Sequence, residues 1–307
     1  MELTGRRIAL LKGGPGSERA VSLETAKGVA LALRSLGAEV TEVDVTGPDF
    51  AVPEGVEAAF NVIHGTFGED GTLQKLLEAQ GVAYTGAGSA SSALAFDKAR
   101  SKAAFVAKKV PTTAYQILEL AGAGPEQVTI PLPLVMKPLC EGSSVGVHII
   151  KDEAGIVAAI ADLATFGATA LVEPFISGKE LTVGILGDQV LPIIHIQPRS
   201  GFYDIANKYP WMGGTGGSDY FCPADLCPET TAAVQDAALA AHQSLGVEVY
   251  SRVDVLLNED EVPFVLEVNT IPGMTSTSLL PKAAAAVGID YPALCARILQ
   301  LSLEVKR

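Results

Sequence analysis

The sequence predicts an α/β protein that is α+β in part, and three observations support this. Strand-like and helix-like segments alternate through the first third of the chain, which is typical of a parallel sheet covered by helices. Further along, several strands are grouped around single helices instead. The 307 residues, 48% of them hydrophobic, are enough for about two packed domains.

The N-terminal part consists of strand and helix units. The strand RRIALLK runs into the glycine-rich loop GGPGS and then into a periodic apolar helix that ends at Gly37. The next expected elements are strands at 38–45 and 58–65, a helix at 72–81 and the short strand VAYTG. This part is expected to end near residue 96, where the basic helix FDKARSKAAFVAKKV begins.

The middle and C-terminal parts contain more strands. Strands are expected at 133–138 and 170–176, separated by the loop CEGSSVG, the strand VHIIK and the helix DEAGIVAAIADLATFG. Strands at 180–198, a glycine-rich stretch, the helix PETTAAVQDAALAAHQSLG and a hairpin at 249–270 follow. The chain closes on the helix YPALCARILQLSLEV.

Charge and composition exclude several partners. The 35 acidic and 22 basic residues give a net charge of -13, and aromatic residues are only 6% of the chain, so we expect no nucleic-acid binding. A small anion in a local pocket is still compatible with this charge. The N-terminal apolar run is too short for a signal peptide or a membrane span, so we expect a cytoplasmic protein without membrane contact.

The cysteines and histidines show no zinc-binding spacing. Cys140, Cys222, Cys227 and Cys295 are scattered, and so are the four histidines. We therefore expect the cysteines to be buried thiols.

The segment VYSRVDVLLNEDEVPFVLEVNT predicts an antiparallel hairpin with its loop at 259–262. In that register Asp254 lies opposite Glu267, and Arg252 lies opposite Asn269. These four polar residues then share one face. The other face is expected to be apolar and to contain Val253, Val255, Leu257, Phe264, Leu266 and Val268.

The polar face has two interpretations. Opposed residues have Cβ atoms about 4.5–5.5 Å apart, so Asp254, Glu267 and Asn269 would bring oxygen ligands suited to magnesium to one place. Alternatively, this is the solvated face of an amphipathic hairpin. Opposed like charges destabilise a hairpin and asparagine is depleted in strands, so the pattern favours the metal site.

A magnesium ion with few protein ligands usually also binds phosphate, so a phosphate-binding loop is expected. The P-loop pattern is absent, and GGPGSE departs from the dinucleotide pattern at Arg19. In MKPLCEGSSVG, Lys137 ends a strand and residues 142–144 supply amides and hydroxyls, although this segment also suits a plain hairpin turn. Lys98 is a second candidate cation, or an ordinary lysine on a helix surface.

The motifs occur in the order of a known family. The chain resembles the D-alanine–D-alanine ligases of the ATP-grasp superfamily in GGPGSERAVSL, HGTFGEDGTLQ, YTGAG, FDKARSK, VMKPLCEGSSVGV, VEPFISGKELTV, YDIANKY, SRVDVLL and LEVNTIPGMTSTSLLP. The resemblance covers essentially the whole chain. It implies a three-lobed ATP-grasp fold with an N-terminal parallel-sheet lobe at 1–96, a central lobe at 97–179 and a C-terminal lobe at 180–307, with ATP between the last two.

The resemblance implies residues for ATP and metal. Lys98 and Lys137 match the lysines that face the phosphates, and Glu180 matches the ribose partner. The other implied ATP contacts are Ser144, Glu173, Pro174, Ile176, Lys208 and Leu266. The implied ligands of magnesium or manganese, with two ions expected, are Asp254, Glu267 and Asn269.

It also implies two D-alanine sites. Glu18 matches the carboxylate that orients the first D-alanine, with His64 nearby, and Glu18, Ser143 and Tyr209 match a hydrogen-bonded set near the attacking amine. The remaining implied substrate contacts are Arg252 and Gly273 at the reacting carboxylate, and Ser278 and Leu279 at the second D-alanine.

The implied reaction joins two D-alanine molecules for peptidoglycan precursor synthesis. One carboxylate attacks the γ-phosphoryl group of ATP, and the second amine displaces phosphate from the acyl phosphate. Arg252 is placed to stabilise the oxyanion, and Tyr209 favours an amine over the hydroxyl group of D-lactate. A homodimer is expected by resemblance.

Two departures and two alternatives accompany this interpretation. Pro174 stands where many relatives carry lysine, and the glycine-rich PWMGGTGGSD, expected to act as a lid, is longer than usual. The alternatives are a related ligase that joins D-alanine to D-lactate or D-serine, and a catalytically silent nucleotide-binding module. The presence of Arg252, Glu267 and Asn269 favours an enzyme.

Overall fold

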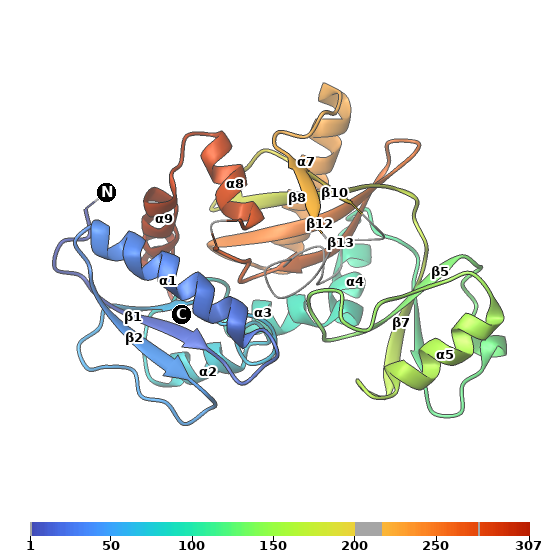
Figure 1. Cartoon of the computed structure of the whole chain (residues 1–307), viewed down its shortest axis with the longest axis horizontal. Helices are drawn as coiled ribbons and strands as arrows, with labels where there is room; N and C mark the ends of the chain where they lie inside the picture. The colour runs from blue at the N-terminus through green and yellow to red at the C-terminus, as the bar shows by residue number, and fades with distance from the viewer. Residues whose placement is uncertain (1, 200–216, 276) are drawn as a thin grey trace.

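The computed structural model describes residues 2–199, 217–275 and 277–307, whose strands form three sheets (Figure 1). The first sheet is parallel, as predicted. Its strands, in spatial order, are β2 (Glu39–Val45), β1 (Arg7–Gly13) and β3 (Ala58–Asn61). The expected strand VAYTG is reduced to a single bridge between Ala59 and Tyr84.

Helices cover both faces of the first sheet. Side chains alternate along β1, so Ile8 and Leu10 pack on one face while Ala9 and Leu11 pack on the other. The helices that cover this sheet are α1 (Arg19–Ser35), α2 (Thr72–Ala79) and the C-terminal α9 (Tyr291–Glu304), while α3 (Ser89–Phe96) follows α2 and packs against the strand Pro263–Asn269 of the third sheet. Because α9 packs against α1, the two ends of the chain share one core (Figure 1).

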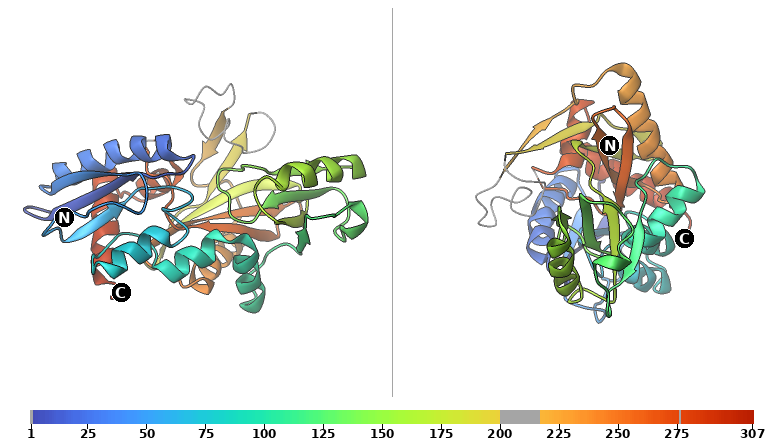
Figure 2. Two further views of the ribbon diagram at one scale, coloured as in Figure 1. Left: turned by 90° about the horizontal axis from the view of Figure 1, so that it is seen from below. Right: turned by 90° about the vertical axis from the view of Figure 1, so that its right-hand side faces the viewer.

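The second sheet is antiparallel and lies at the opposite end of the molecule (Figure 2). Its strands, in spatial order, are β4 (Gln116–Glu119), β7 (Thr169–Pro174), β5 (Leu134–Pro138) and β6 (His148–Ile150). The short helix η1 (Pro125–Gln127) follows β4, and α5 (Glu153–Leu163) buries Ile156, Ala159 and Leu163 against the sheet. The Asp152 side chain begins α5 by accepting a hydrogen bond from the Gly155 amide at 2.8 Å.

The third sheet lies between the other two. Its path is β11 (Ser218–Phe221), β10 (Ile194–Pro198), β8 (Gly178–Leu186), β12 (Tyr250–Asn258) and β13 (Pro263–Asn269), with β9 (Gln189–Val190) paired to β8. The associated helices are α4 (Lys98–Ala107), α7 (Pro228–Ser244) and α8 (Leu279–Ala286). Helix α7 packs on β12 and β13 and fills the core beneath them.

The hairpin register is confirmed where it matters for the site. Arg252 pairs with Asn269, and Asp254 pairs with Glu267. Beyond Asp254 a β-bulge shifts the register by one residue, so Val255 pairs with Val265. The prediction that Leu266 packs in the apolar core, together with Phe264, was therefore wrong: Val265 takes the core position.

The structure also bears on the expected buried cysteines and on membrane contact. Cys295 is buried, but Cys140 and Cys227 are exposed, so the expectation of buried thiols fails for these two. Within residues 2–199, 217–275 and 277–307, no helix has the length and apolar character needed to cross a lipid bilayer.

The burial of His242 predicts that the folded protein loses stability at acidic pH. His242 of α7 lies beside Ser251 of β12, with 2.8 Å between Nδ1 and Oγ. Burial lowers its pKa to about 4 from 6.5, and Asp188 offsets this only in part. Because the unfolded chain takes up the proton first, this stabilisation is complete above about pH 6.5 and is lost as the pH falls towards 4.

We expect His242→Gln to reduce the pH dependence of stability. Between pH 7.5 and pH 5 the free energy of unfolding of the wild-type protein should fall by about 2 kcal/mol more than that of the variant. Urea unfolding of both proteins at the two pH values measures this difference. Equal losses in the two proteins would show that His242 does not titrate in this range.

Candidate active site

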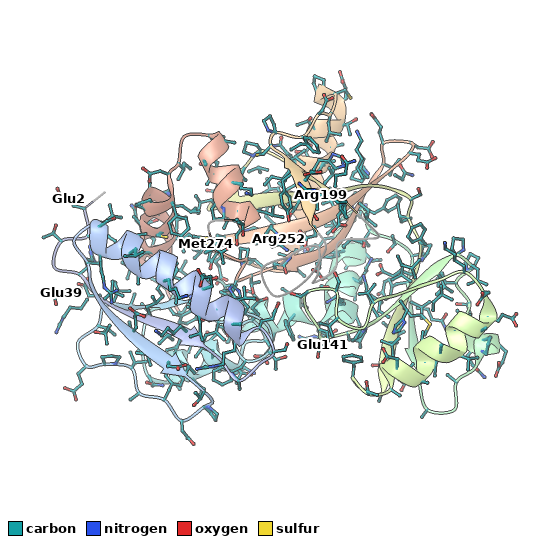
Figure 3. The ribbon with its side chains drawn as sticks, in the orientation of Figure 1. Glu2, Glu39, Glu141, Arg199, Arg252 and Met274 are labelled. Carbon is teal, nitrogen blue, oxygen red and sulfur yellow. The ribbon has the colours of Figure 1, made fainter. Side chains whose placement is uncertain are left out.

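Three adjoining cavities are lined by loops and strand faces from all three sheets. The large cavity lies between the second and third sheets, the polar cavity lies beside β12 and β13, and the loop cavity lies between residues 17–18 and residues 141–145. Glu267 lines both the large and the polar cavity, and Gly142 lines all three. In Figure 3, Glu141 and Arg252 lie in the middle of the view, between the two end sheets.

Strand alternation selects which side chains face the large cavity. On β5, Leu134 and Met136 enter the core, whereas Val135 and Lys137 line the cavity. On β13 the bulge places the consecutive residues Leu266 and Glu267 at the cavity wall. The sequence-predicted ATP contacts that line this cavity are Lys98, Lys137, Ser144, Glu173, Pro174, Ile176, Glu180 and Leu266.

Two lysines bring positive charge to the large cavity. Lys98 Nζ donates to the carbonyl oxygen of Glu141 at 2.6 Å and lies 3.3 Å from Glu267 Oε2. Lys98 stands in the first turn of α4, which Asp97 caps through the amides of Ala99 and Arg100. Lys137 Nζ lies 2.5 Å from Glu173 Oε2. Both lysines are nearly buried, so their charges act in a weakly screened environment.

The polar cavity gathers most of the predicted substrate contacts. Its lining includes Glu18, His64, Ser143, Arg252, Glu267, Asn269, Gly273, Ser278 and Leu279. Ser278 stands at the N-cap position of α8, and its Oγ accepts a hydrogen bond from the preceding Thr275 amide at 2.9 Å instead of bonding an amide of the helix. A Cβ at Gly273 would lie 2.9 Å from Ser278 Oγ, so glycine allows this close approach.

The loop at residues 142–146 is held against helix α1. Ser143 Oγ donates a short hydrogen bond to Glu18 Oε1, which links the loop to the N-cap residue of that helix. Ser143 and Ser144 both have positive φ, at 52° and 60°, a conformation that is unfavourable for residues with side chains. The loop is therefore a constrained turn that presents two adjacent hydroxyl-bearing residues to the cavities.

His64 is buried at the back of the polar cavity. Its Nδ1 lies 3.0 Å from the Ile271 carbonyl oxygen and 3.6 Å from Glu69 Oε1, and its Nε2 lies 3.2 Å from Thr25 Oγ1. Burial lowers the pKa of His64, but the carboxylate of Glu69 outweighs it, so the pKa lies above its usual value. The raised pKa favours the protonated, positively charged form of His64, whose ring is held in place in the same cavity lining as Glu18.

The carboxylate of Asp254 is at the centre of the polar face of the hairpin. Arg252 Nε and Nη2 donate to its two oxygens at 3.0 and 2.9 Å, and Thr182 Oγ1 donates at 2.6 Å. Asn269 Nδ2 donates at 3.1 Å. This bonding orients the carboxylate towards the residues that line the large cavity.

The donor set suits a hard divalent cation. Asp254 and Glu267 supply carboxylate oxygens on neighbouring strands, and the Asn269 side chain supplies an amide oxygen. Two carboxylates and one amide match an ion completed by phosphate oxygens rather than a closed protein cage. Across the described part of the chain, no cluster of three or more His, Cys, Asp or Glu side chains forms such a cage.

The structure adds polar residues that sequence reasoning missed. They are Thr25, Glu69, Lys102, Thr113, Glu141, Thr182 and Tyr220. Glu69 and Asp70 are adjacent in the motif HGTFGEDGTLQ, and the sequence alone did not show which of the two belongs to the site. In the structure Glu69 lies beside His64, whereas the Asp70 carboxylate accepts hydrogen bonds from the amides of Phe67 and Thr72, both at 2.9 Å. The predicted Lys208 and Tyr209 lie outside the described residues, as does most of the expected lid.

Comparisons with known proteins agree with this geometry. A family model described as the D-ala D-ala ligase C-terminus matches residues 107–300, and one described as the D-ala D-ala ligase N-terminus matches residues 47–87. A D-alanine–D-alanine ligase of Methylacidiphilum infernorum is 46% identical over 97% of this chain and 95% of its own. One from Anaeromyxobacter dehalogenans is 44% identical over 96% of each chain.

Solved structures show the same architecture. The D-alanine–D-alanine ligase of Bacillus anthracis has a TM-score of 0.86 at 31% identity and covers 98% of both chains. The VanG D-Ala:D-Ser ligase of Enterococcus faecalis has a TM-score of 0.84 at 25% identity, over 97% of this chain and 100% of its own. From the family models and the full-length relatives together, the chain belongs to the D-alanine–D-alanine ligase family, with its ATP-grasp fold.

Proposed function

We propose that this protein joins two D-alanine molecules into D-alanyl-D-alanine at the expense of ATP. The position of Glu267 carries the proposal, because this carboxylate lies in the wall shared by a large cavity with two lysines and a polar cavity with an arginine. Such a shared wall places a nucleotide phosphate beside a second substrate. The relatives at 42–46% identity are D-alanine–D-alanine ligases, which supports the choice of substrate.

The large cavity is the proposed ATP site. Lys98 and Lys137 would neutralise phosphate charge. Glu173 and Pro174 at the end of β7, with Ile176 two residues further on, would meet the base. Pro174 retains its carbonyl acceptor but has no side-chain cation. The further proposed contacts are Ser144, Glu180 and Leu266 in the cavity, and Lys208 by resemblance alone.

Magnesium or manganese, with two ions expected, fits Asp254, Glu267 and Asn269. Bound there, the metal would supply neutralising charge to the phosphoryl group. Thr182 and Arg252 would hold the Asp254 carboxylate in place for it.

The polar cavity is the proposed site of the two D-alanines. Glu18, backed by His64, would bind the ammonium group of the first, whose carboxylate would lie near Arg252 and Gly273. The second would lie at Ser278 and Leu279. Holding both substrates beside the phosphate replaces a bimolecular encounter with a positioned reaction.

Amine attack requires a place for one proton and for one developing negative charge. The Ser143 hydroxyl, already bonded to Glu18, provides a path for the proton from the amine, with Tyr209 added by resemblance. Arg252 is placed to stabilise the oxyanion that forms when the amine adds to the acyl phosphate.

The decisive assay is ATP hydrolysis that depends on D-alanine. Phosphate should be released when D-alanine is the only amino acid present and should not be released without it. Mass spectrometry should identify D-alanyl-D-alanine as the product. Parallel reactions with added D-lactate or D-serine test the related ligases. Absence of turnover with D-alanine alone, or turnover only in a mixture, would overturn the proposal.

We propose an oligomeric state and a cellular location for the protein as well. The proposal of a cytoplasmic homodimer that acts in peptidoglycan precursor synthesis rests on family membership. Light scattering of the purified protein measures the oligomeric state.

Lobe boundaries near residues 97 and 180 are supported by the strands, because the second sheet lies within residues 116–174. Core sharing between α1 and α9 means that the first lobe also uses the C-terminal end.

A glycine beside Glu18 provides a test of substrate orientation. Gly65 has a φ of 69°, and a Cβ there would lie 2.7 Å from Glu18 Oε2. Gly81 has nearly the same φ, 67°, but a Cβ there would meet no neighbouring atom within 4 Å. The two positions therefore share a left-handed φ, but only at Gly65, which is buried at the loop cavity, would a methyl group meet Glu18.

We expect Gly65→Ala and Gly81→Ala to lose similar stability, about 1 kcal/mol each, from the left-handed backbone. Only Gly65→Ala should displace Glu18 and lower kcat/KM for D-alanine, by up to about 100-fold. Thermal unfolding and steady-state kinetics of both variants measure the two effects. Equal kinetic losses would show that backbone strain, and not Glu18, is responsible.

A further inference from the structure

Lys102 is a fully buried lysine in the middle of α4. Its side chain is 0% exposed, and its Nζ lies 2.7 Å from Thr112 Oγ1 and 2.6 Å from Thr113 Oγ1. Its third partner is Glu173 Oε1, at short distance. A buried ammonium group is stable only when it is paired and hydrogen-bonded, and these three oxygens meet that need.

Glu173 lies between two ammonium groups. Lys102 contacts Oε1, which also accepts a hydrogen bond from Thr113, whereas Lys137 contacts Oε2 at 2.5 Å. Burial alone would raise the pKa of Glu173, but Lys137 and Lys102 together lower it to about 2. The carboxylate of Glu173 therefore stays ionised between the two lysines.

The two lysines differ in what else they can reach. Lys137 is 11% exposed and lines the large cavity. Lys102 is anchored away from it, because Thr112 Oγ1 also donates to the Val265 carbonyl oxygen of β13 at 2.7 Å. The Val265 amide bonds back to the Pro111 carbonyl oxygen at 2.8 Å, which fixes this segment to the third sheet.

We propose that Lys102 is a positioning residue that serves as the permanent counter-ion of Glu173 and so allows Lys137 to turn towards the phosphates of a bound nucleotide. This inference rests on the proposed ATP site. If Lys102 were absent, moving Lys137 away from Glu173 would leave an ionised, buried carboxylate without a cation, which is strongly unfavourable. Lys137 would then remain with Glu173, and the phosphates would lose one cationic contact.

The test compares ATP with adenosine, which keeps the base and ribose but has no phosphate. Calorimetry on the full chain, with magnesium fixed and no D-alanine present, gives both dissociation constants. In Lys102→Met, ATP binding should weaken about tenfold, the loss of one charge-assisted contact, while adenosine binding is retained. Adenosine binding is retained because Lys137 still holds Glu173 ionised beside the base.

A double-mutant cycle with Lys137→Met completes the test. In that background Lys102→Met should weaken ATP binding no more than it weakens adenosine binding, because the lysine that it releases is already gone and the loss of both cations from Glu173 affects the two ligands alike. Equal weakening of ATP and adenosine by Lys102→Met when Lys137 is present, or an undiminished selective loss of ATP binding when Lys137 is absent, would overturn the proposal and leave Lys102 a structural residue.

Two controls keep the result interpretable. Thermal unfolding establishes that each variant is folded. Thr113→Val replaces a hydroxyl group of the cluster by a methyl group of similar size and should weaken ATP binding selectively, by about threefold. An equal loss of adenosine binding in Thr113→Val would also count against the proposal. Because these measurements involve no ligation, a wild-type protein that binds ATP but does not turn over D-alanine would refute the proposed function alone.

Discussion

Glu267→Gln is expected to lower kcat/KM for D-alanine by at least about 100-fold while leaving the protein folded. The substitution removes one negative charge and almost no volume. Glu267 lies in the wall between the large and polar cavities, opposite Asp254 and 3.3 Å from Lys98 Nζ. A neutral amide is a weaker ligand for magnesium, and the transferring phosphoryl group would lose neutralising charge as a result.

The stability of this variant should change little. Glu267 is 26% exposed, so its ion pair with Lys98 is partly screened and contributes no more than about 1 kcal/mol. Lys98 also retains its bond to the Glu141 carbonyl oxygen. Removing one of two opposed carboxylates further relieves their repulsion when no metal is bound.

Glu259→Gln is the matched control, since it makes the same change on the exposed loop of the same hairpin. Phosphate release should be measured for both variants over a range of magnesium concentrations. Glu259→Gln should match the wild-type protein, whereas Glu267→Gln should need more magnesium for its residual activity. Full activity of Glu267→Gln at ordinary magnesium concentration would remove the metal assignment.

The hairpin illustrates how far sequence alone can lead. Period-two alternation predicted that Asp254 and Glu267 lie opposite each other, and the structure confirms it. The bulge was not predictable, because Val265 and Leu266 are both apolar and either one can occupy a core position. The bulge matters for the site, since it places Leu266 and Glu267 side by side at the large cavity.

Residues that depend on distant segments escaped prediction for a different reason. Lys102 lies in a lysine-rich helix and has the local pattern of a surface residue. Lys102 can be buried because its charge is paired with the carboxylate of Glu173, which belongs to β7, a strand distant in the sequence. In the same way, nothing local indicates that α9 completes the core over α1. Strand alternation reports which residues share a face, but not which distant element covers that face.

Arg252→Lys is expected to lower kcat by about 100- to 1000-fold with little change in ATP affinity. Arg252 lines the polar cavity and donates two hydrogen bonds to Asp254, at 3.0 and 2.9 Å. Lysine keeps the positive charge but has no planar fork, so it cannot both hold Asp254 in this geometry and direct a donor at the developing oxyanion. Thr182 and Asn269 still bond Asp254, and the two lysines of the large cavity are unchanged, so ground-state ATP binding should survive.

Arg19→Lys provides the comparison, because Arg19 donates two hydrogen bonds to Asp44 at 2.8 and 2.7 Å on an exposed part of the first lobe. Losing that fork should leave kcat unchanged within about twofold, as expected for an exposed ion pair. Steady-state kinetics and calorimetric titration with ATP separate turnover from nucleotide binding. A fall in ATP affinity as large as the fall in kcat would mean that Arg252 acts by holding Asp254 at the metal site, whereas a selective loss of kcat places its effect in the transition state of amine attack.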